Sequence, residues 1–197
     1  MYTQDELQQM PRRTVEEYRT MVRPALRSGD LLFASGNFFF SKLIKRASHS
    51  TWSHVALIYR IPPPTDRVLV LESIEVHGVR LAPLTKYLDN YLDDAPYPGS
   101  VYIARYGEGI SEDKFQQMLR LGCDLLTARY GYIDMASMAL SLLSGRRFRQ
   151  RRDQYVCSEL VEACFKRAGL TVKKTYPLMS PEDFAQDPAV RFLHRLL

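Results

Sequence analysis

Apolar and polar residues follow different periods in the two halves of the chain, and the first half predicts β-strands. Residues 53–61 (SHVALIYRI) alternate and are rich in β-branched and aromatic residues, which is typical of a strand. After the loop PPPTD, a second strand is expected from Val68 to about Val76. Shorter strands are expected to start at Leu31–Phe33 and to cover Val101–Tyr106.

The second half of the chain has the spacing of helices. Ser111 is expected to cap a helix, because acidic residues and then a periodic apolar face follow it. That face consists of Phe115, Met118, Leu119, Gly122, Leu125 and Leu126. Further helices are expected over about 133–143 and 156–168, and a short one is expected to open at Ser180 and Pro181.

Two more helical segments are expected before the first hairpin. The first twenty residues have a helical pattern that Pro11 interrupts and Pro24 closes. Phe38–Ala47 could form a short amphipathic helix. Strands that precede helices predict an α+β domain rather than a βαβ alternation. A chain of 197 residues is long enough for one domain with a full core.

Composition permits many partners but excludes a few classes of protein. Apolar residues make up 46% of the chain and charged residues 25%, with a net charge of +5, so an anionic partner is permitted but not required. The longest apolar stretch, Ile133–Leu143, is too short to span a bilayer. The polar N-terminus lacks the apolar region of a secretory signal. We therefore expect a protein made in the cytoplasm, which could be exported only by a dedicated secretion system.

Three cysteines at irregular spacing argue against a structural role for disulfides or zinc. The number is odd and no CxxC pair is present. We expect no metal and no other cofactor. Cys123 and Cys164 fall in predicted helix interiors, where they fit as small core residues.

Cys157 differs from the other two cysteines because it begins a predicted helix. The apolar stripe that follows it, at 160, 161, 164, 165 and 168, gives that helix a continuous core-facing side. A thiol in the first turn lies near the positive end of the helix and its free N–H groups, which favour a thiolate and could bind an oxyanion. Ser158 belongs to the same turn. The alternative is that Cys157 is another small buried residue.

The predicted hairpin brings a histidine and a carboxylate to one face. His54, Ala56 and Ile58 share one face of the first strand. A turn centred on Pro63 would place His54 opposite Glu72, whereas a shift of two residues would place Val70 or Ile74 there. A carboxylate beside an imidazole fixes its tautomer and stabilises the imidazolium. The alternative is a hydrogen-bonded histidine at a strand end, with the carboxylate at an exposed sheet edge.

Four segments together resemble a known family. They are GDLLF (29–33), SHVALI (53–58), LES…GV (71–79) and CSELVEA (157–163). The chain is similar to the circularly permuted NlpC-type branch of the papain-like superfamily, in particular its YiiX-like members, and more distantly to lecithin:retinol acyltransferase. Unpermuted members carry the cysteine helix first, whereas the order here is His54, Glu72, Cys157.

The resemblance implies a fold and a set of site residues. It implies an antiparallel sheet packed against the cysteine helix, with Cys157 as nucleophile, His54 as base and Glu72 as the orienting group. Tyr130 and Tyr132 are similar to tyrosines that line the family's active site, and with Ser158 they are assigned to the substrate pocket or the oxyanion site. Within a single catalytic domain, 29–170 would be the permuted core, 1–24 an N-terminal helical extension and 171–197 a C-terminal helical tail.

The resemblance also implies a reaction, although several substrates remain open. The first interpretation is a cysteine amidase or endopeptidase acting on bacterial cell-wall-type peptides. The second is a lipid-directed thiol acyl hydrolase or acyltransferase. The third is a catalytically silent relative that binds peptide or acyl ligands, and the intact Cys157 and His54 argue against it.

One basic segment bears on the choice of partner. The run Arg146–Arg152 follows an apolar stretch and could contact an anionic membrane. A solvated loop after a core helix is the simpler interpretation. No nucleic-acid recognition motif accompanies the run, so no nucleic acid is expected.

Overall fold

The computed structural model describes residues 3–36, 50–75, 77–91, 94–131, 154–173 and 179–197. The helices expected over 38–47 and 133–143, and the arginine run 146–152, lie outside the described residues.

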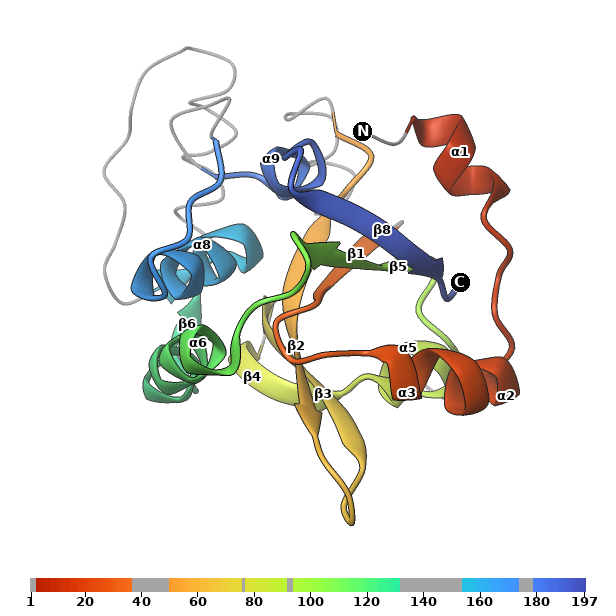
Figure 1. The fold of residues 1–197 in the computed structure, drawn as a ribbon, viewed down its shortest axis with the longest axis horizontal. Coiled ribbons are helices and arrows are strands. Elements are labelled where there is room, and N and C mark those ends of the chain that lie inside the picture. The colour runs from red at the N-terminus through yellow and green to blue at the C-terminus, as the bar shows by residue number, and fades with distance from the viewer. Residues whose placement is uncertain (1–2, 37–49, 76, 92–93, 132–153, 174–178) are drawn as a thin grey trace.

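The centre of the molecule is a six-stranded antiparallel sheet with the order β4-β3-β2-β1-β5-β8 (Figure 1). Its strands are β1 (Leu31–Gly36), β2 (His54–Ile61), β3 (Arg67–Ile74), β4 (Gly78–Pro83), β5 (Gly99–Tyr106) and β8 (Val190–Arg195). The α+β class and the antiparallel sheet predicted from the sequence are confirmed.

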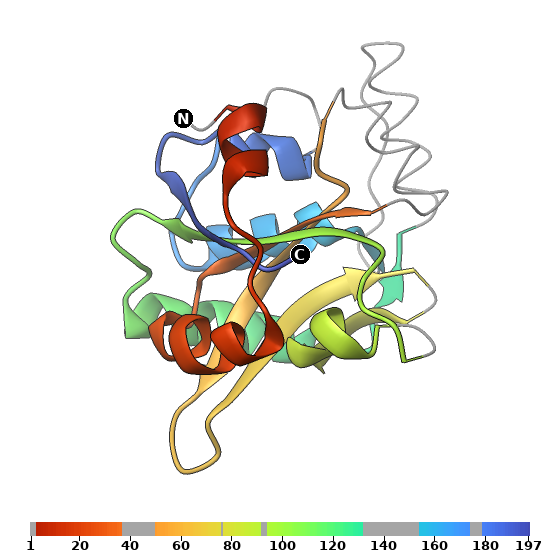
Figure 2. The same ribbon diagram turned by 90° about the vertical axis from the view of Figure 1, so that its right-hand side faces the viewer.

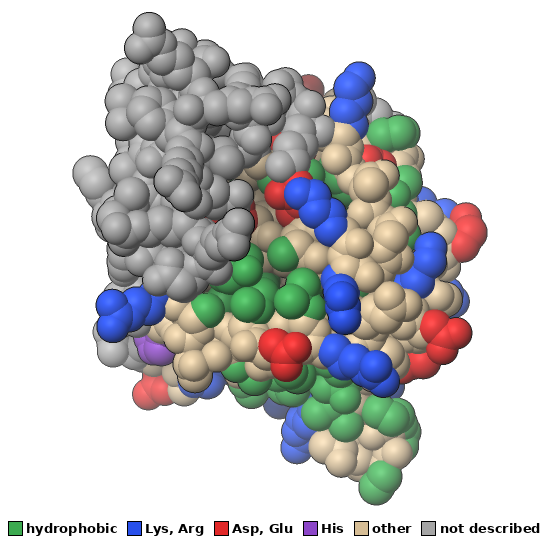
Figure 3. Space-filling view, turned by 90° about the vertical axis from the view of Figure 1, so that its left-hand side faces the viewer, with side chains coloured by type: hydrophobic (Ala, Val, Ile, Leu, Met, Phe, Trp, Pro, Cys, Tyr) green, Lys and Arg blue, Asp and Glu red, His purple; other side chains and the backbone are tan. Residues whose placement is uncertain are grey.

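One face of the sheet carries the helix that begins at Cys157. The helices α6 (Glu112–Asp124), α8 (Cys157–Arg167) and α9 (Pro181–Ala185) cover this face. Leu160, Val161 and Cys164 of α8 are fully buried against Val55 and Leu57 of β2, which confirms the apolar stripe read from the sequence. Seen from this side, hydrophobic side chains gather near the centre of the surface, and charged ones lie around them (Figure 3).

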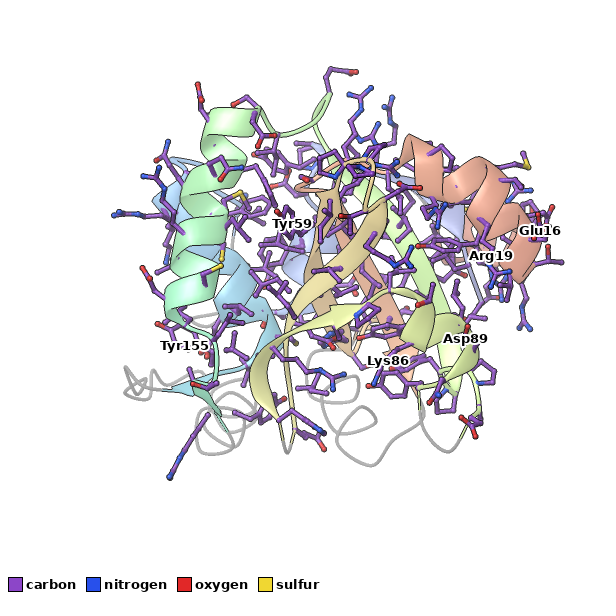
Figure 4. The ribbon with its side chains drawn as sticks, turned by 90° about the horizontal axis from the view of Figure 1, so that it is seen from below. Glu16, Arg19, Tyr59, Lys86, Asp89 and Tyr155 are labelled. Carbon is purple, nitrogen blue, oxygen red and sulfur yellow. The ribbon has the colours of Figure 1, made fainter. Side chains whose placement is uncertain are left out.

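The opposite face is covered by α5 (Thr85–Asp89) and by the N-terminal segments α2 (Val15–Glu17), the π-helical turn η1 (Tyr18–Val22) and α3 (Arg23–Ala25). The first helix, α1 (Gln4–Gln9), instead packs Leu7 into the core of the α8 face. Buried residues of η1 and α5 pack on the even-numbered residues of β2, including Ala56 and Ile58. Figure 2 shows α2, α3 and α5 on the near side of the strands, and Figure 4 shows α6 on the other side.

A small parallel ladder connects the segments on either side of residues 132–153. Strand β6 (Arg129–Tyr130) pairs with β7 (Gln154–Tyr155), and Tyr130 is the partner of Tyr155. The chain leading into β6 runs against the start of β4, where Gly78 has a φ of +65°. A Cβ atom on Gly78 would lie 2.0 Å from the carbonyl oxygen of Ala128, so only glycine fits this crossing.

Most predicted elements are confirmed, and two corrections concern strands. The strands β1, β2, β3 and β5 and the helices α6, α8 and α9 lie where the pattern places them. The tail 171–197 was expected to be helical, but it ends in β8, which pairs with β5. The alternation that makes β8 a strand buries Val190 and Phe192 and leaves Arg191 exposed.

The register of the β2–β3 hairpin was also wrong, by two residues. Ile58 pairs with Val70 rather than with Val68, and this register places Glu72 opposite Ala56 rather than opposite His54. The pairing of Ile61 with Arg67 centres the turn on Pro64, the middle of the loop PPPTD, and not on Pro63. Asp66 ends this loop with a φ of +41°, and its carboxylate accepts from Arg60 at 2.8 Å. A shift of two keeps every side chain on its expected face.

None of the helices in the described part of the chain combines the length and the apolarity that a bilayer crossing requires.

Candidate active site

His54 is the first residue of β2, one of the two central strands of the sheet. Its backbone pairs with Ala34 of β1, and its side chain shares a face with Ala56 and Ile58. The imidazole is 13% exposed, so it lies at the margin of the core and not in bulk solvent. Its Nε2 atom is 3.1 Å from Oε2 of Glu72.

Glu72 reaches His54 diagonally across the hairpin. In the observed register Glu72 lies two residues away from the position opposite His54. Such diagonal neighbours on one face of a sheet are still within reach of long side chains. The Glu72 side chain is fully buried. The sequence prediction that these two residues lie together therefore survives the wrong register.

Cys157 approaches the same imidazole from the other layer. It is the first residue of α8 and is buried, and its thiol is hydrogen-bonded to the His54 side chain. Because Nε2 is engaged by Glu72, the Nδ1 atom is the ring nitrogen left for the thiol. The structure thus brings thiol, imidazole and carboxylate into one chain of contacts.

These contacts change the protonation of the histidine. Burial alone lowers the pKa of His54, but the hydrogen bonds to Cys157 and Glu72 and the charges of both residues outweigh it and raise the pKa to about 10. At neutral pH the ring is therefore an imidazolium. A protonated imidazole beside a thiol stabilises the thiolate form, which is the nucleophile in thiol chemistry.

The carboxylate of Glu72 stays ionised in spite of its burial. Burial raises the pKa of Glu72, but the hydrogen bond and charge of His54, the charge of Arg80 and the hydroxyl of Tyr87 lower it below the ordinary value of 4.5. The result is a permanent negative charge behind the imidazolium, which holds the ring in one orientation.

The other two cysteines lack these surroundings. Cys164 is fully buried in the core, and burial raises the pKa of its thiol to about 12. Cys123 lies exposed on α6. Among the three cysteines, Cys157 alone is hydrogen-bonded to a histidine in the part of the chain that the structure describes.

The start of α8 also provides hydrogen-bond donors. Val156 precedes the helix, and its N–H donates to Oε2 of Glu159 at 3.2 Å. The N–H groups of a first helical turn have no acceptor within the helix, so those at Cys157 and Ser158 are available to an oxyanion beside the thiol. The hydroxyl of Ser158 is not, because it is buried and donates to the carbonyl of Met179 at 2.8 Å.

Of the two predicted pocket tyrosines, one can be placed. Tyr130 is buried beside Tyr155, two residues before Cys157, and Gly131 N–H donates to the Tyr155 carbonyl at 3.2 Å. Tyr130 therefore flanks the segment that carries the thiol. Tyr132 lies outside the described residues.

Sequence reasoning missed three residues around the site. Arg80 and Tyr87 both contact the Glu72 carboxylate, and Ser73 donates to the Tyr155 carbonyl at 2.6 Å. Nothing in the sequence pairs Arg80 or Tyr87 with Glu72, because β4 and α5 were not predicted. The strand period alone could have indicated that Ser73 faces the opposite side from Glu72.

The chemistry available here is that of a thiol hydrolase. Within the described residues, no group of His, Cys, Asp and Glu side chains is arranged to hold a metal ion. A thiol paired with an imidazolium, a buried carboxylate and free N–H groups at a helix start are the parts needed for attack on a carbonyl.

Comparison with known proteins agrees with this arrangement. A family model described as permuted papain-like amidase enzyme, YaeF/YiiX, C92 family, matches residues 25–194. No curated protein matches the chain. The crystal structure of "metalloprotein yiiX from Escherichia coli O157:H7, DUF1105" superposes with a TM-score of 0.65 at 17% identity, covering 86% of this chain and 97% of that chain. At this identity the likeness shows a shared fold.

Proposed function

Since the chain belongs to the permuted papain-like amidases of the C92 family, whose model spans residues 25–194, we propose that Cys157, His54 and Glu72 are its catalytic triad. The family is one of cysteine peptidases and amidases, so the chain is a hydrolase. The observation that carries the assignment is the continuous contact from the buried Glu72 carboxylate through His54 to Cys157.

The first half of the reaction makes a thioester. The Cys157 thiolate attacks the carbonyl carbon of the scissile amide, and the oxygen takes the negative charge beside the N–H groups at the start of α8. His54, protonated at neutral pH, gives its proton to the nitrogen as the C–N bond breaks. The amine leaves and the acyl group stays on Cys157.

The second half releases the acid and restores the site. His54, now neutral, takes a proton from water as the water oxygen attacks the thioester carbonyl. Collapse of the intermediate breaks the C–S bond, so the carboxylic acid leaves and the thiolate and imidazolium are regenerated. Glu72 keeps its charge throughout and holds the imidazole in place.

For the substrate, we propose bacterial cell-wall-type peptides. This extends the resemblance to NlpC-type enzymes, which commonly cleave such peptides. The competing class is a lipid acyl group, which the distant similarity to lecithin:retinol acyltransferase suggests.

One experiment addresses both the reaction and the substrate. The protein is incubated separately with peptidoglycan fragments and with anionic phospholipid vesicles, and the products are identified by mass spectrometry, with Cys157→Ala as the inactive control. We expect new amine and carboxylate ends in the peptidoglycan sample only. Fatty acid release from the vesicles would replace the peptide proposal by the lipid one. Equal products from wild type and Cys157→Ala would contradict the triad.

The same vesicles test the arginine run. We propose that Arg146–Arg152 does not bind membranes, so wild type and a variant with its five arginines changed to glutamine should bind the vesicles equally weakly. Tight, salt-sensitive binding by wild type alone would favour the lipid substrate.

A further inference from the structure

The chain of contacts in the candidate site does not end at Glu72. Its carboxylate is fully buried, and both oxygens are bonded from two further elements. Arg80 on β4, the direct cross-strand partner of Glu72, lies 2.9 Å from Oε1 through both Nε and Nη2. Tyr87 on α5 donates its hydroxyl to Oε2, the oxygen that also faces His54.

A buried carboxylate needs such partners to remain charged. Without compensation, removal from water favours the protonated acid. The Arg80 guanidinium supplies the opposite charge, 2.9 Å from Oε1. The hydroxyl of Tyr87 remains a donor, because burial and the nearby charge of Glu72 raise its pKa well above the ordinary value of 10.0.

The same partners fix the direction of the carboxylate. The Nε and Nη2 atoms of Arg80 converge on the single oxygen Oε1 and fix its position. The Tyr87 hydroxyl takes one lone pair of Oε2 and leaves the other for the Nε2–H group of His54.

We propose that Arg80 and Tyr87 are positioning residues that hold Glu72 ionised and in one orientation, so that the Cys157–His54 pair depends on them for its working pH range. The inference rests on the proposed function, because it concerns the triad of that reaction.

The charged and titratable groups around Glu72 come from each element packed against it. They are His54 from β2, Arg80 from β4, Tyr87 from α5 and, slightly further on, Tyr91, while Cys157 acts through His54. Loss of Arg80 or Tyr87 leaves Glu72 easier to protonate. A neutral Glu72 stabilises the imidazolium less, so the thiolate forms only at higher pH.

The test uses a readout that needs no substrate. The full-length protein is treated briefly with iodoacetamide over a pH series, and labelling of Cys157 is followed by peptide mapping. The reference variants are His54→Ala and Glu72→Gln. The test variants are Tyr87→Phe, which keeps the ring in its contacts with Tyr91 and Tyr97, and Arg80→Gln.

We expect both test variants to move the midpoint of Cys157 labelling upward by about one pH unit, the size of one hydrogen bond to a charged group. Glu72→Gln should move it at least as far. Arg80→Lys keeps the positive charge, so its labelling midpoint should lie between those of wild type and Arg80→Gln. The matched control is Tyr102→Phe, which also loses one buried hydroxyl bond, to the Leu7 carbonyl at 3.1 Å, and should leave the midpoint unchanged.

The outcomes separate this inference from the proposed function. If His54→Ala and Glu72→Gln shift the midpoint but Tyr87→Phe and Arg80→Gln superimpose on wild type, the positioning role is wrong and the triad stands. If even His54→Ala leaves the profile unchanged, the triad itself is contradicted. Should Arg80→Gln fail to fold, Tyr87→Phe decides the matter alone, because it removes only an oxygen atom.

Discussion

Glu72 is the residue on which the electrostatics of the site depend. It is a fully buried carboxylate that binds an imidazole, a guanidinium and a phenol, each from a different element. Its place in the site and its strand face could be predicted from the sequence, since a glutamate among apolar strand positions is unusual. Its partners Arg80 and Tyr87 were not, because their contacts are set by the packing of β4 and α5.

Replacing Glu72 by glutamine should change how stability depends on pH. The folded-state pKa of Glu72 is lowered, so its contribution to stability is present above about pH 4.5 and is lost as the pH falls through the lower folded-state value. At pH 7 we expect Glu72→Gln to be about 2 kcal/mol less stable, because charged hydrogen bonds are lost. The difference should shrink below pH 4.5.

Denaturant unfolding of both proteins between pH 3 and pH 7 measures this difference. A gap that stays constant over the whole range would mean that the carboxylate is not the ionised, buried partner of His54.

At the scale of elements, β3 holds both halves of the site. Glu72 on one face of the strand contacts His54, and Ser73 on the other face donates to the Tyr155 carbonyl, two residues before Cys157. Figure 4 shows Tyr155 on the α6 side of the sheet and Lys86 and Asp89 of α5 on the other side. One strand thus sets the distance between the nucleophile and its base.

Removal of the Ser73 hydroxyl should weaken catalysis more than stability. The Tyr155 carbonyl still accepts from Gly131, so Ser73→Ala should cost about 1 kcal/mol of unfolding free energy. Without the bond from Ser73, Tyr155 and the nearby Cys157 thiol can shift slightly relative to His54. Because attack on a carbonyl requires close alignment of the thiol, kcat should fall roughly tenfold with KM unchanged.

A comparison variant separates the two effects. Ser180→Ala removes another buried serine hydroxyl, the N-cap of α9, and should cost about 1 kcal/mol without changing kcat. Equal kcat values for the two variants would contradict the role of Ser73.

The elements also show where sequence reasoning stops. Strand faces were predicted correctly because they depend on a local period of two. The hairpin register was not, since it depends on whether the turn is centred on Pro63 or Pro64, and either centre leaves every side chain on the same face. Strand β8 was missed because a single short alternation of apolar and polar residues does not reveal that the edge of β5 is available to pair with it.

At the scale of the whole molecule, the two layers on the sheet meet at the site. The helix α8 brings Cys157 from one face, while α5 supports Glu72 from the other, and His54 at the start of β2 connects them. The permuted order of the three residues could be predicted because four sequence segments together resemble the family. That the proposed triad contacts elements from both layers follows only from the folded arrangement.

The central claim is that His54 activates Cys157, and the most direct measurement compares the three cysteines in one protein. Wild type and His54→Ala are treated briefly with iodoacetamide at pH 7 and mapped by peptide mass spectrometry. Cys123, which is exposed, serves as the internal reference, and Cys164 as the buried one.

In wild type we expect Cys157 to label roughly tenfold faster than Cys123 although it is buried, and Cys164 to remain unlabelled because its pKa is raised to about 12. In His54→Ala, labelling of Cys157 should fall to the rate of Cys123 or below, with Cys123 unchanged. Equal labelling of Cys157 and Cys164 in wild type, or an unchanged Cys157 rate in His54→Ala, would contradict the account.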